Sequence, residues 1–193
     1  MTTKKLINTP TLKHHGFSLV EIIITLSLLS ILMANATPYF GQILDKNRNK
    51  AQGVQLHLSL SLARTYAITN SVDVVVCPAV TMQQKQCKPK NIANSNWQHG
   101  WLVFADNNRD GILDSSEELL QSRTLLERQA VVFNQNGRLR FFPNGSARSA
   151  GFYLCNASQS SQRYIRLLHT GRTRISTQLT EIQAARCHAG LDA

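Results

Sequence analysis

The sequence predicts an α+β chain in which one long N-terminal helix packs on an antiparallel β-sheet head. Residues 17–37 form an apolar run whose only ionisable side chain is Glu21, and helical spacing of apolar residues continues to about residue 70. After Asn70 the composition changes to β-branched and aromatic runs separated by turn residues. The 193 residues, 42% of them hydrophobic, are enough for a single domain with its own core.

The N-terminal segment combines a basic leader with an apolar helix. Residues 1–16 contain three lysines and no acid, and the run that follows is about one bilayer thick as a helix. Because basic flanks stay in the cytoplasm, we expect a single-pass anchor in the inner membrane with the head in the periplasm. An uncleaved anchor would explain all of this except Glu21, since a carboxylate in an apolar helix is costly and usually has a partner.

The helix is expected to continue as an amphipathic segment over residues 39–70. Its apolar face follows helical spacing through Phe40, Ile43, Ala51, Val54, Leu58, Leu62 and Tyr66, and is broadened by Leu56, Leu60, Ala63 and Ala67. Strict alternation from Val54 to Leu62 would also suit a strand, but the abundance of leucine, alanine and glutamine favours a helix.

The remainder, residues 71–193, is expected to form the β-rich head. The strand candidates are Val72–Cys77, Gly100–Ala105, Ala130–Asn134, Arg138–Phe142, Gly151–Cys155, Tyr164–Leu168 and Arg172–Ser176. Asn136-Gly137 predicts a hairpin between two of them. The chain therefore divides into a leader (1–16), a membrane helix (17–38), an amphipathic helix (39–70) and the head (71–193).

The four cysteines show neither CxxC pairs nor histidines at zinc-ligand spacing, so a zinc site is not expected. Four cysteines allow three pairings in an exported protein. Proximity in sequence favours Cys77–Cys87 and Cys155–Cys187.

Charge is unevenly distributed along the chain, which has a formal net charge of +10. Beyond Gly137 there are eight arginines against only Glu181 and Asp192. A basic C-terminal region indicates either a polyanion-binding surface or simply a solvated strand face.

Residues 106–117 match the pattern of a calcium-binding loop, D-x-[DN]-x-[DN]-G-x5-E. Asp106, Asn108, Asp110 and Glu117 would supply the oxygen ligands. The loop follows a predicted strand rather than a helix, however, and such a composition is also ordinary for a turn between strands. Apart from this candidate calcium ion, no cofactor is expected.

The sequence Gly16-Phe17-x-x-x-Glu21, placed between a basic leader and an apolar helix, resembles the signal of type IV prepilins. The resemblance implies that a prepilin peptidase cuts between Gly16 and Phe17 and that the new Phe17 amine is methylated. It also implies that Glu21 neutralises the terminal amine of a neighbouring pilin subunit during assembly. The mature chain would then leave the inner membrane for a pilus at the cell surface.

The head is similar to those of FimT/GspH-like minor pilins and pseudopilins. The residues that carry this likeness are Ala63-Arg64, Val74–Cys77, the segment from Trp97 to Gly111, and Gly171-Arg172-Thr173-Arg174. The resemblance implies the type IV pilin fold. It also implies a role in DNA binding for the GRxR motif at positions 171–174.

Positions 172 and 174 are two residues apart in a predicted strand, so both guanidinium groups would face the same side. They could then contact one phosphate backbone. Several nearby arginines are candidates for extending that patch: Arg138, Arg140, Arg148, Arg163 and Arg166. Under the opposite interpretation, Arg172 and Arg174 are solvated or pair with Glu181.

The sequence thus predicts a minor type IV pilin that binds extracellular double-stranded DNA for natural transformation. The alternative is a GspH-like pseudopilin of type II secretion, or a pilus-priming subunit, without a nucleic-acid ligand. No catalytic Ser/His/Asp or Cys/His arrangement and no phosphate-cradling glycine loop stands out, so we do not expect an enzyme.

Overall fold

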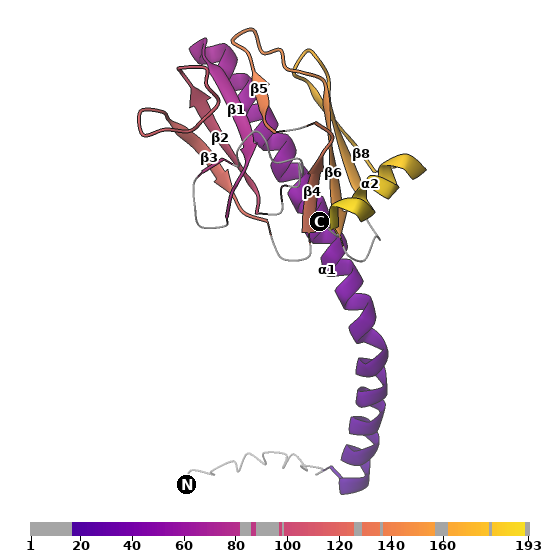
Figure 1. Ribbon diagram of the computed structural model, residues 1–193. Helices are drawn as coiled ribbons and strands as arrows, with labels where there is room; N and C mark the ends of the chain where they lie inside the picture. Colours follow the sequence, from indigo (N-terminus) through magenta and orange to yellow (C-terminus); the bar gives the residue numbers. More distant parts are fainter. Residues whose placement is uncertain are drawn as a thin grey trace, which may run out of the picture. The chain divides into compact units, whose positions relative to one another are not determined.

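The computed structural model describes residues 17–81, 86–87, 97, 99–125, 129–135, 137–156, 162–177 and 179–191. The predicted leader, 1–16, lies outside these ranges. The chain divides into two compact units, Met1–Phe40 and Gly41–Ala193, and helix α1 (Leu19–Asn70) contributes residues to both (Figure 1).

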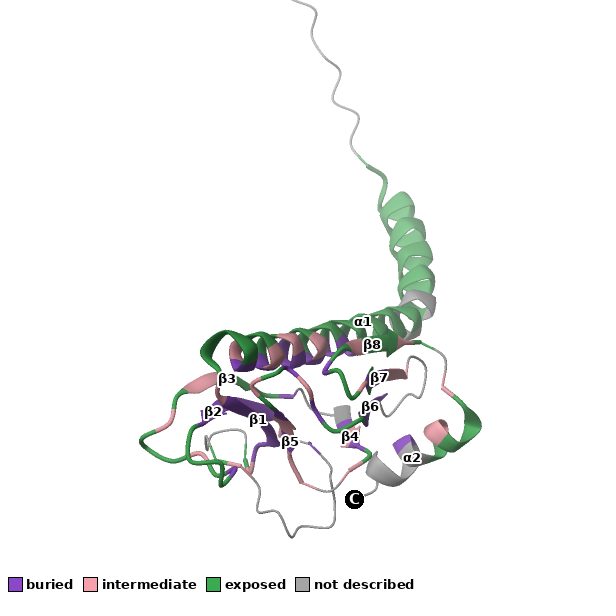
Figure 2. Ribbon diagram, turned by 90° about the horizontal axis from the view of Figure 1, so that it is seen from above, coloured by how far each residue is buried: buried purple, intermediate pink, exposed green. Residues whose placement is uncertain are grey.

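The C-terminal unit, Gly41–Ala193, contains two antiparallel sheets of four strands each. The first has the order β3-β2-β1-β5, with bounds β3 Leu119–Arg123, β2 Trp101–Asp106, β1 Asp73–Pro78 and β5 Leu139–Phe141. The second has the order β4-β6-β7-β8, with bounds β4 Gln129–Phe133, β6 Ala150–Asn156, β7 Arg163–Leu167 and β8 Thr173–Ser176. Both sheets face the part of α1 that belongs to this unit (Figure 2).

One apolar stripe of α1 joins the two sheets into a single core. Leu56, Leu60, Ala63 and Ala67 are fully buried, and their spacing of three and four residues places them on one helix face. They pack against side chains of both sheets, among them Trp101 of β2 and Phe152 of β6. This shared core holds the β7–β8 hairpin against α1.

The other apolar stripe, which the sequence suggested as the main packing face, is largely solvent-exposed in this unit. Val54 is 42% exposed, Leu58 58% and Leu62 39%. Residues two positions apart on a helix point about 200° apart, so the stripes containing Leu58 and Leu60 lie on nearly opposite sides. Apolar spacing identified a helix here, but it could not tell which of the two stripes meets the sheets.

The first sheet is buried on both faces, which explains why every residue of β1 and β2 is buried. On one face Val103 belongs to the core shared with α1. On the other face Phe104 packs in a smaller cluster that includes Leu113, from the loop that follows β2. That loop therefore covers the outer face of the sheet.

The two disulfides are those favoured from sequence. Cys77, in β1, is bonded to Cys87, and Cys155, in β6, is bonded to Cys187 of helix α2 (Glu181–Leu191). Helix α2 packs on β4 and β6, where both members of the second disulfide are buried. This confirms the predicted pairing.

The predicted α+β class is confirmed, and each predicted strand has a counterpart. The hairpin predicted at Asn136-Gly137 is wrong, because β4 pairs with β6 and β5 pairs with β1. The chain between β4 and β5 crosses from one sheet to the other, and Gly137 adopts a positive φ of 83° there. Strand β3 and helix α2 were not predicted.

Candidate nucleic-acid interface

The GRTR motif begins in the turn that connects β7 and β8. The amide of Gly171 donates to the carbonyl of Leu168, and the amide of Leu168 donates to the carbonyl of Arg172, both at 2.9 Å. Gly171 has a φ of +74°, a conformation that favours glycine. A Cβ atom at this position would clash with the carbonyl oxygen of Gly145, so glycine is also required for space.

Arg64 of α1 holds the β7–β8 turn against the turn that contains Gly145. Its Nε lies 3.2 Å from the carbonyl oxygens of both Gly145 and Thr170 and donates to them. A further contact joins the hairpin to α1, because the Thr173 hydroxyl lies 2.7 Å from Nδ1 of His57. Two α1 side chains thus fix the position of the motif, and Arg64 was noted in the sequence only as part of a family resemblance.

Two exposed arginines lie directly opposite each other on β7 and β8. The register pairs Arg166 with Arg174. Neighbouring Thr173 contacts α1, so alternation along β8 places Arg174 on the sheet face that points away from α1. Like charges at opposed positions of an antiparallel pair are destabilising unless a counter-charge is present.

No acidic partner for these side chains lies in the part of the chain that the structure describes. Arg166, Arg172 and Arg174 are all exposed, and none forms a salt bridge with a described residue. Glu181, which the sequence offered as a partner, is described and is not paired with them. We call Arg166, Arg172 and Arg174 the arginine tip.

The prediction that Arg172 and Arg174 face one side was based on both lying in one strand, and Arg172 lies in the turn before β8. Arg172 precedes the first residue of β8 and lines a cavity on the α1 side of the hairpin. Arg174 lies on the opposite face, beside Arg166. Because β8 begins at Thr173, the alternation of a strand does not extend to Arg172.

Arg140 does not extend the arginine tip, contrary to expectation. Its guanidinium bonds Asp73 at 3.0 Å and Asp106 at 2.7 Å, and also donates to the carbonyl of Arg109. The two carboxylate side chains are only 4% and 0% exposed. Arg140 therefore neutralises a buried acidic pair in the first sheet.

Arg138 likewise lies against the acidic loop, residues 106–117, and does not belong to the tip. A Cβ atom on Gly111 would lie 3.1 Å from its Nη1, which places the guanidinium against that loop. Burial lowers the pKa of Arg138, while the carboxylates of Asp110 and Asp106 oppose the shift. Arg138 and Arg140 together supply positive charge to the segment that resembled a calcium loop.

The candidate calcium ligands are engaged in contacts within the chain. Asp106 accepts from Arg140, Asp110 accepts from the amide of Ile112 at 2.6 Å, and Glu117 accepts from the amide of Asn107 at 3.0 Å. Asn108 accepts from the amide of Asp110 at 3.0 Å. Within the described ranges, no three His, Cys, Asp or Glu side chains form a group that could hold a metal ion.

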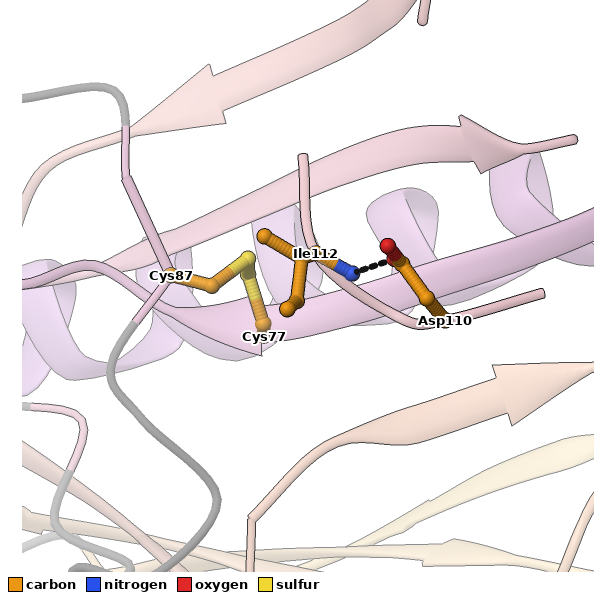
Figure 3. The surroundings of a disulfide bond; sticks show 4 residues. All are labelled: Cys77, Cys87, Asp110 and Ile112. Atoms are coloured by element: carbon orange, nitrogen blue, oxygen red, sulfur yellow. Dashed lines mark hydrogen bonds between the residues drawn. A yellow bond between two sulfur atoms is a disulfide. The ribbon is translucent and has the colours of Figure 1, made fainter. Parts of the chain in front are cut away.

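The acidic loop packs Leu113 against the first sheet, while the neighbouring Ile112 is 54% exposed. Figure 3 shows Ile112 beside the Cys77–Cys87 disulfide, with its amide directed at the Asp110 carboxylate. These turn-forming hydrogen bonds are typical of Asp and Asn between strands. In the structure this segment connects β2 to β3 through such hydrogen bonds.

Of the remaining candidates, Arg148 lies nearer the tip than Arg163 does. Arg148 is exposed and follows Ala147, whose amide donates to the carbonyl of His169 in the β7–β8 turn at 3.0 Å. Arg163 begins β7, at the far end of that strand from the turn. Its Cδ would lie 3.3 Å from a Cβ atom on Gly53, so its side chain lies against α1.

The N-terminal motif is described in part. Phe17 is 78% exposed and Glu21 lies in the first turn of α1, whereas Gly16 is outside the described residues. In the described part of the chain, no single helix has the length and hydropathy of a membrane span. Two helical pieces reach that length and composition only when they are taken together as a bent pair: Leu19–Ala34 and Tyr39–Asn70.

Comparison with protein families identifies both parts of the chain. The model described as type II transport protein GspH matches residues 52–171. The chain belongs to the GspH family. The model described as a prokaryotic N-terminal methylation motif matches residues 11–34, which include Gly16, Phe17 and Glu21. No curated protein matches this GspH-family chain.

Solved structures with a similar fold include two minor pilin-like proteins. The type IV minor pilin FimU of Pseudomonas aeruginosa PAO1 is 15% identical, with a TM-score of 0.48, and the match covers 66% of this chain and 91% of that one. The minor pseudopilin EpsH of the Vibrio cholerae type 2 secretion system is 14% identical, with a TM-score of 0.49, and the match covers 67% and 97%.

The GspH match ends at Gly171. It includes Arg64, Gly145 and Arg166, which position or belong to the tip, but not Arg172 or Arg174. The pairing of Arg166 with Arg174 and the clamping role of Arg64 were missed from sequence. A clue to the pairing was that both arginines lie within a few residues of Gly171 and on either side of it.

Proposed function

We propose that this GspH-family subunit is a minor type IV pilin that binds extracellular double-stranded DNA for natural transformation. Family membership supports a minor pilin or pseudopilin role in a type IV pilus or in type II secretion. Family and fold are those of structural subunits. DNA binding is the specific step that we add.

The cross-strand arginine pair carries this proposal. Arg166 and Arg174 are opposed and exposed, and neither has an acidic partner among the described residues. A phosphate backbone placed across them would supply the missing negative charge, and guanidinium groups bind phosphate oxygens in bidentate fashion. Arg172 in the adjoining turn, with Arg148 on the neighbouring segment, adds positive charge.

Binding of this kind should be independent of base sequence and sensitive to salt. Phosphate contacts position DNA without reading bases, and each neutralised phosphate releases counterions. A single subunit is expected to bind with a dissociation constant of roughly 10⁻⁴ to 10⁻⁶ M, the range of non-specific binding. Several subunits on one pilus would bind the same DNA more tightly through avidity.

The test compares DNA binding by the full chain in neutral detergent with binding by Arg166→Gln/Arg174→Gln, over a series of salt concentrations. The matched control, Arg48→Gln/Arg123→Gln, removes the same charge from exposed arginines on α1 and β3. We expect the tip variant to lose affinity and to lower the slope of log K against log salt by about 1.8, at 0.9 per phosphate contact. Equal binding by the tip variant and the control would overturn the proposal.

Membrane insertion and assembly would depend on the N-terminal motif. We propose that the prepilin peptidase cuts between Gly16 and Phe17, and that the Glu21 carboxylate pairs with the methylated Phe17 amine of an adjacent subunit. The match to a methylation motif over residues 11–34 supports this. Glu21→Val should leave the head folded and block incorporation into filaments, which immunoblotting of sheared pili would detect. Normal incorporation would contradict this role.

The second candidate is a GspH-like pseudopilin of type II secretion, or a pilus-priming subunit, without a nucleic-acid ligand. The description of the matching family as a type II transport protein favours it. Both candidates share the N-terminal motif and the fold. The salt series separates them, because a subunit of this second kind should show no salt-sensitive binding even at low ionic strength.

A further inference from the structure

A cavity of about 270 Å³ lies between α1 and the β7–β8 turn. It is lined by His57, Ser61, Arg64, Thr65, Gly171, Arg172 and Thr173. We infer that this cavity binds a phosphate group of the nucleic acid, as a second contact distinct from the Arg166–Arg174 pair. The inference rests on the proposed function and deepens it. The DNA interface would then consist of the exposed arginine pair and of this cavity beside it.

The cavity combines positive charge with available hydroxyl groups. Arg64 and Arg172 come from its two walls, and no carboxylate is among its lining residues. Ser61 and Thr65 are one helical turn apart, so they lie on the same face of α1. Neither hydroxyl has a hydrogen-bond partner in the described part of the chain. The Arg64 guanidinium and the two hydroxyls form a donor set suited to phosphate oxygens, and Arg172 at the rim adds positive charge.

Arg64 is already fixed in position before any ligand binds. Its Nε donates to the carbonyls of Gly145 and Thr170, and its terminal amines have no partner among the described residues. The guanidinium is planar, so anchoring Nε also sets the directions in which the terminal amines can donate. A donor that is held in place loses less side-chain entropy on binding, which favours recognition of an anion.

The opposite wall is held to α1 by a hydrogen bond between side chains. The Thr173 hydroxyl lies 2.7 Å from Nδ1 of His57, and Gly171 packs against Arg64 without room for a Cβ atom. The cavity is therefore bordered by two elements whose separation is set by direct contacts. Thr173, which lines the cavity, precedes Arg174 in β8, so the cavity and the Arg166–Arg174 pair lie at the same end of the hairpin. One DNA strand that crosses this end can contact both.

A variant that fills the cavity without changing charge tests the inference. Thr65 is exposed and lines the cavity, so Thr65→Trp adds bulk at its rim and keeps every arginine. Thr69→Trp is the matched control, because Thr69 is an exposed threonine one turn further along α1 that does not line the cavity. Both variants are made in the full chain in neutral detergent.

We expect Thr65→Trp to weaken DNA binding roughly tenfold, the effect of losing one hydrogen bond to a charged group, while Thr69→Trp binds like the parent. The Thr65→Trp variant should also broaden the ³¹P resonance of added inorganic phosphate less than the parent does. A second variant, Ser61→Ala/Thr65→Val, removes only the hydroxyls. It should weaken binding several-fold without changing the salt slope, because no charge is lost.

The form of DNA identifies which phosphate enters the cavity. A loss of affinity that is equal for closed circular and linear duplexes assigns a backbone phosphodiester. A loss confined to linear duplexes with a 5′-phosphate assigns a terminal phosphomonoester. Binding by both cavity variants at the parent's affinity, while Arg166→Gln/Arg174→Gln binds weakly, would overturn this inference and leave the proposed function standing. No DNA binding by the parent chain would overturn both.

Discussion

Replacing Arg140 should destabilise the chain strongly without acting on the arginine tip. Its guanidinium bonds Asp73 at 3.0 Å and Asp106 at 2.7 Å, and the two acidic side chains are 4% and 0% exposed. Arg140→Met keeps much of the aliphatic stem but leaves both carboxylates buried and without that counter-charge. Asp106 is the more severely affected, because its other carboxylate oxygen is buried with no hydrogen-bond partner among the described residues.

The expected cost is about 3–5 kcal/mol, the usual result of removing one member of a buried ion pair. For a unit of ~150 residues each kcal/mol lowers Tm by about 2–4 °C, so the melting temperature should fall by roughly 6–20 °C. Adding Asp106→Asn should recover part of the loss, because one of the two uncompensated charges is then removed. The exposed Arg148, changed to Met in the same way, should alter stability by less than about 0.5 kcal/mol.

Urea unfolding of the full chain in detergent measures this effect, with the fluorescence of Trp97 and Trp101 as the signal. Both side chains are fully buried, so their emission should report loss of the core. The same variants are then tested for DNA binding under conditions where they remain folded. If Arg140→Met unfolds like the parent and binds DNA poorly, the assignment of Arg140 to the buried ion pair is wrong and it belongs to the interface.

Three further predictions concern the hairpin, the disulfides and the acidic loop. Gly171→Ala should cost at least about 1 kcal/mol by urea unfolding, since it places a Cβ atom at positive φ and against a neighbouring carbonyl; parental stability would contradict the turn geometry. Cys155–Cys187 closes a loop of 32 residues and Cys77–Cys87 a loop of 10. Replacing both cysteines of the first pair by alanine should therefore lower the free energy of unfolding by about 1 kcal/mol more than the same change in the second pair. The reversed order would contradict this expectation. Burial raises the pKa of Glu117, so the folded state binds the proton of this carboxyl group more tightly than the unfolded state does. The free energy of unfolding therefore decreases as pH rises through the raised pKa. Glu117→Gln should therefore gain stability relative to the parent at neutral pH and lose that advantage at acidic pH in melts across pH, and a difference independent of pH would refute the assignment.

The sequence predicted elements better than it predicted how they pair. The apolar run after Gly16 and the change in composition after Asn70 indicated a long helix followed by strands, because those signals are local. The pairing of β4 with β6 and of β5 with β1 depends on which strand reaches which sheet. A turn signal such as Asn136-Gly137 carries no such information. Strand β3 has the half-buried sequence LLQSR, which lacks the β-branched and aromatic residues used to recognise the others.

The sequence predicted which residues share the hairpin end, but not which other arginines lie beside them. Gly171, Arg172 and Arg174 were singled out correctly as residues of one hairpin end, since they are close in sequence. The loss of Arg140 from the patch could not be foreseen, because Asp73 lies 67 residues away along the chain. The addition of Arg64 has the same cause: its bond to Thr170 spans 106 residues. Contacts between distant segments decide which of these arginines are exposed.

This division of the arginines also bears on how the net charge of +10 should be understood. Arg138 and Arg140 offset carboxylates of the first sheet and its loop, so they contribute little field to solvent. Arg166, Arg172 and Arg174 have no salt bridge within the described chain, and all of them belong to one hairpin whose turn is clamped by Arg64. A surface that only needed solubility could place such charges anywhere, and separating them would avoid the repulsion of an opposed pair. Their concentration on a braced hairpin supports the proposal of a phosphate-binding surface.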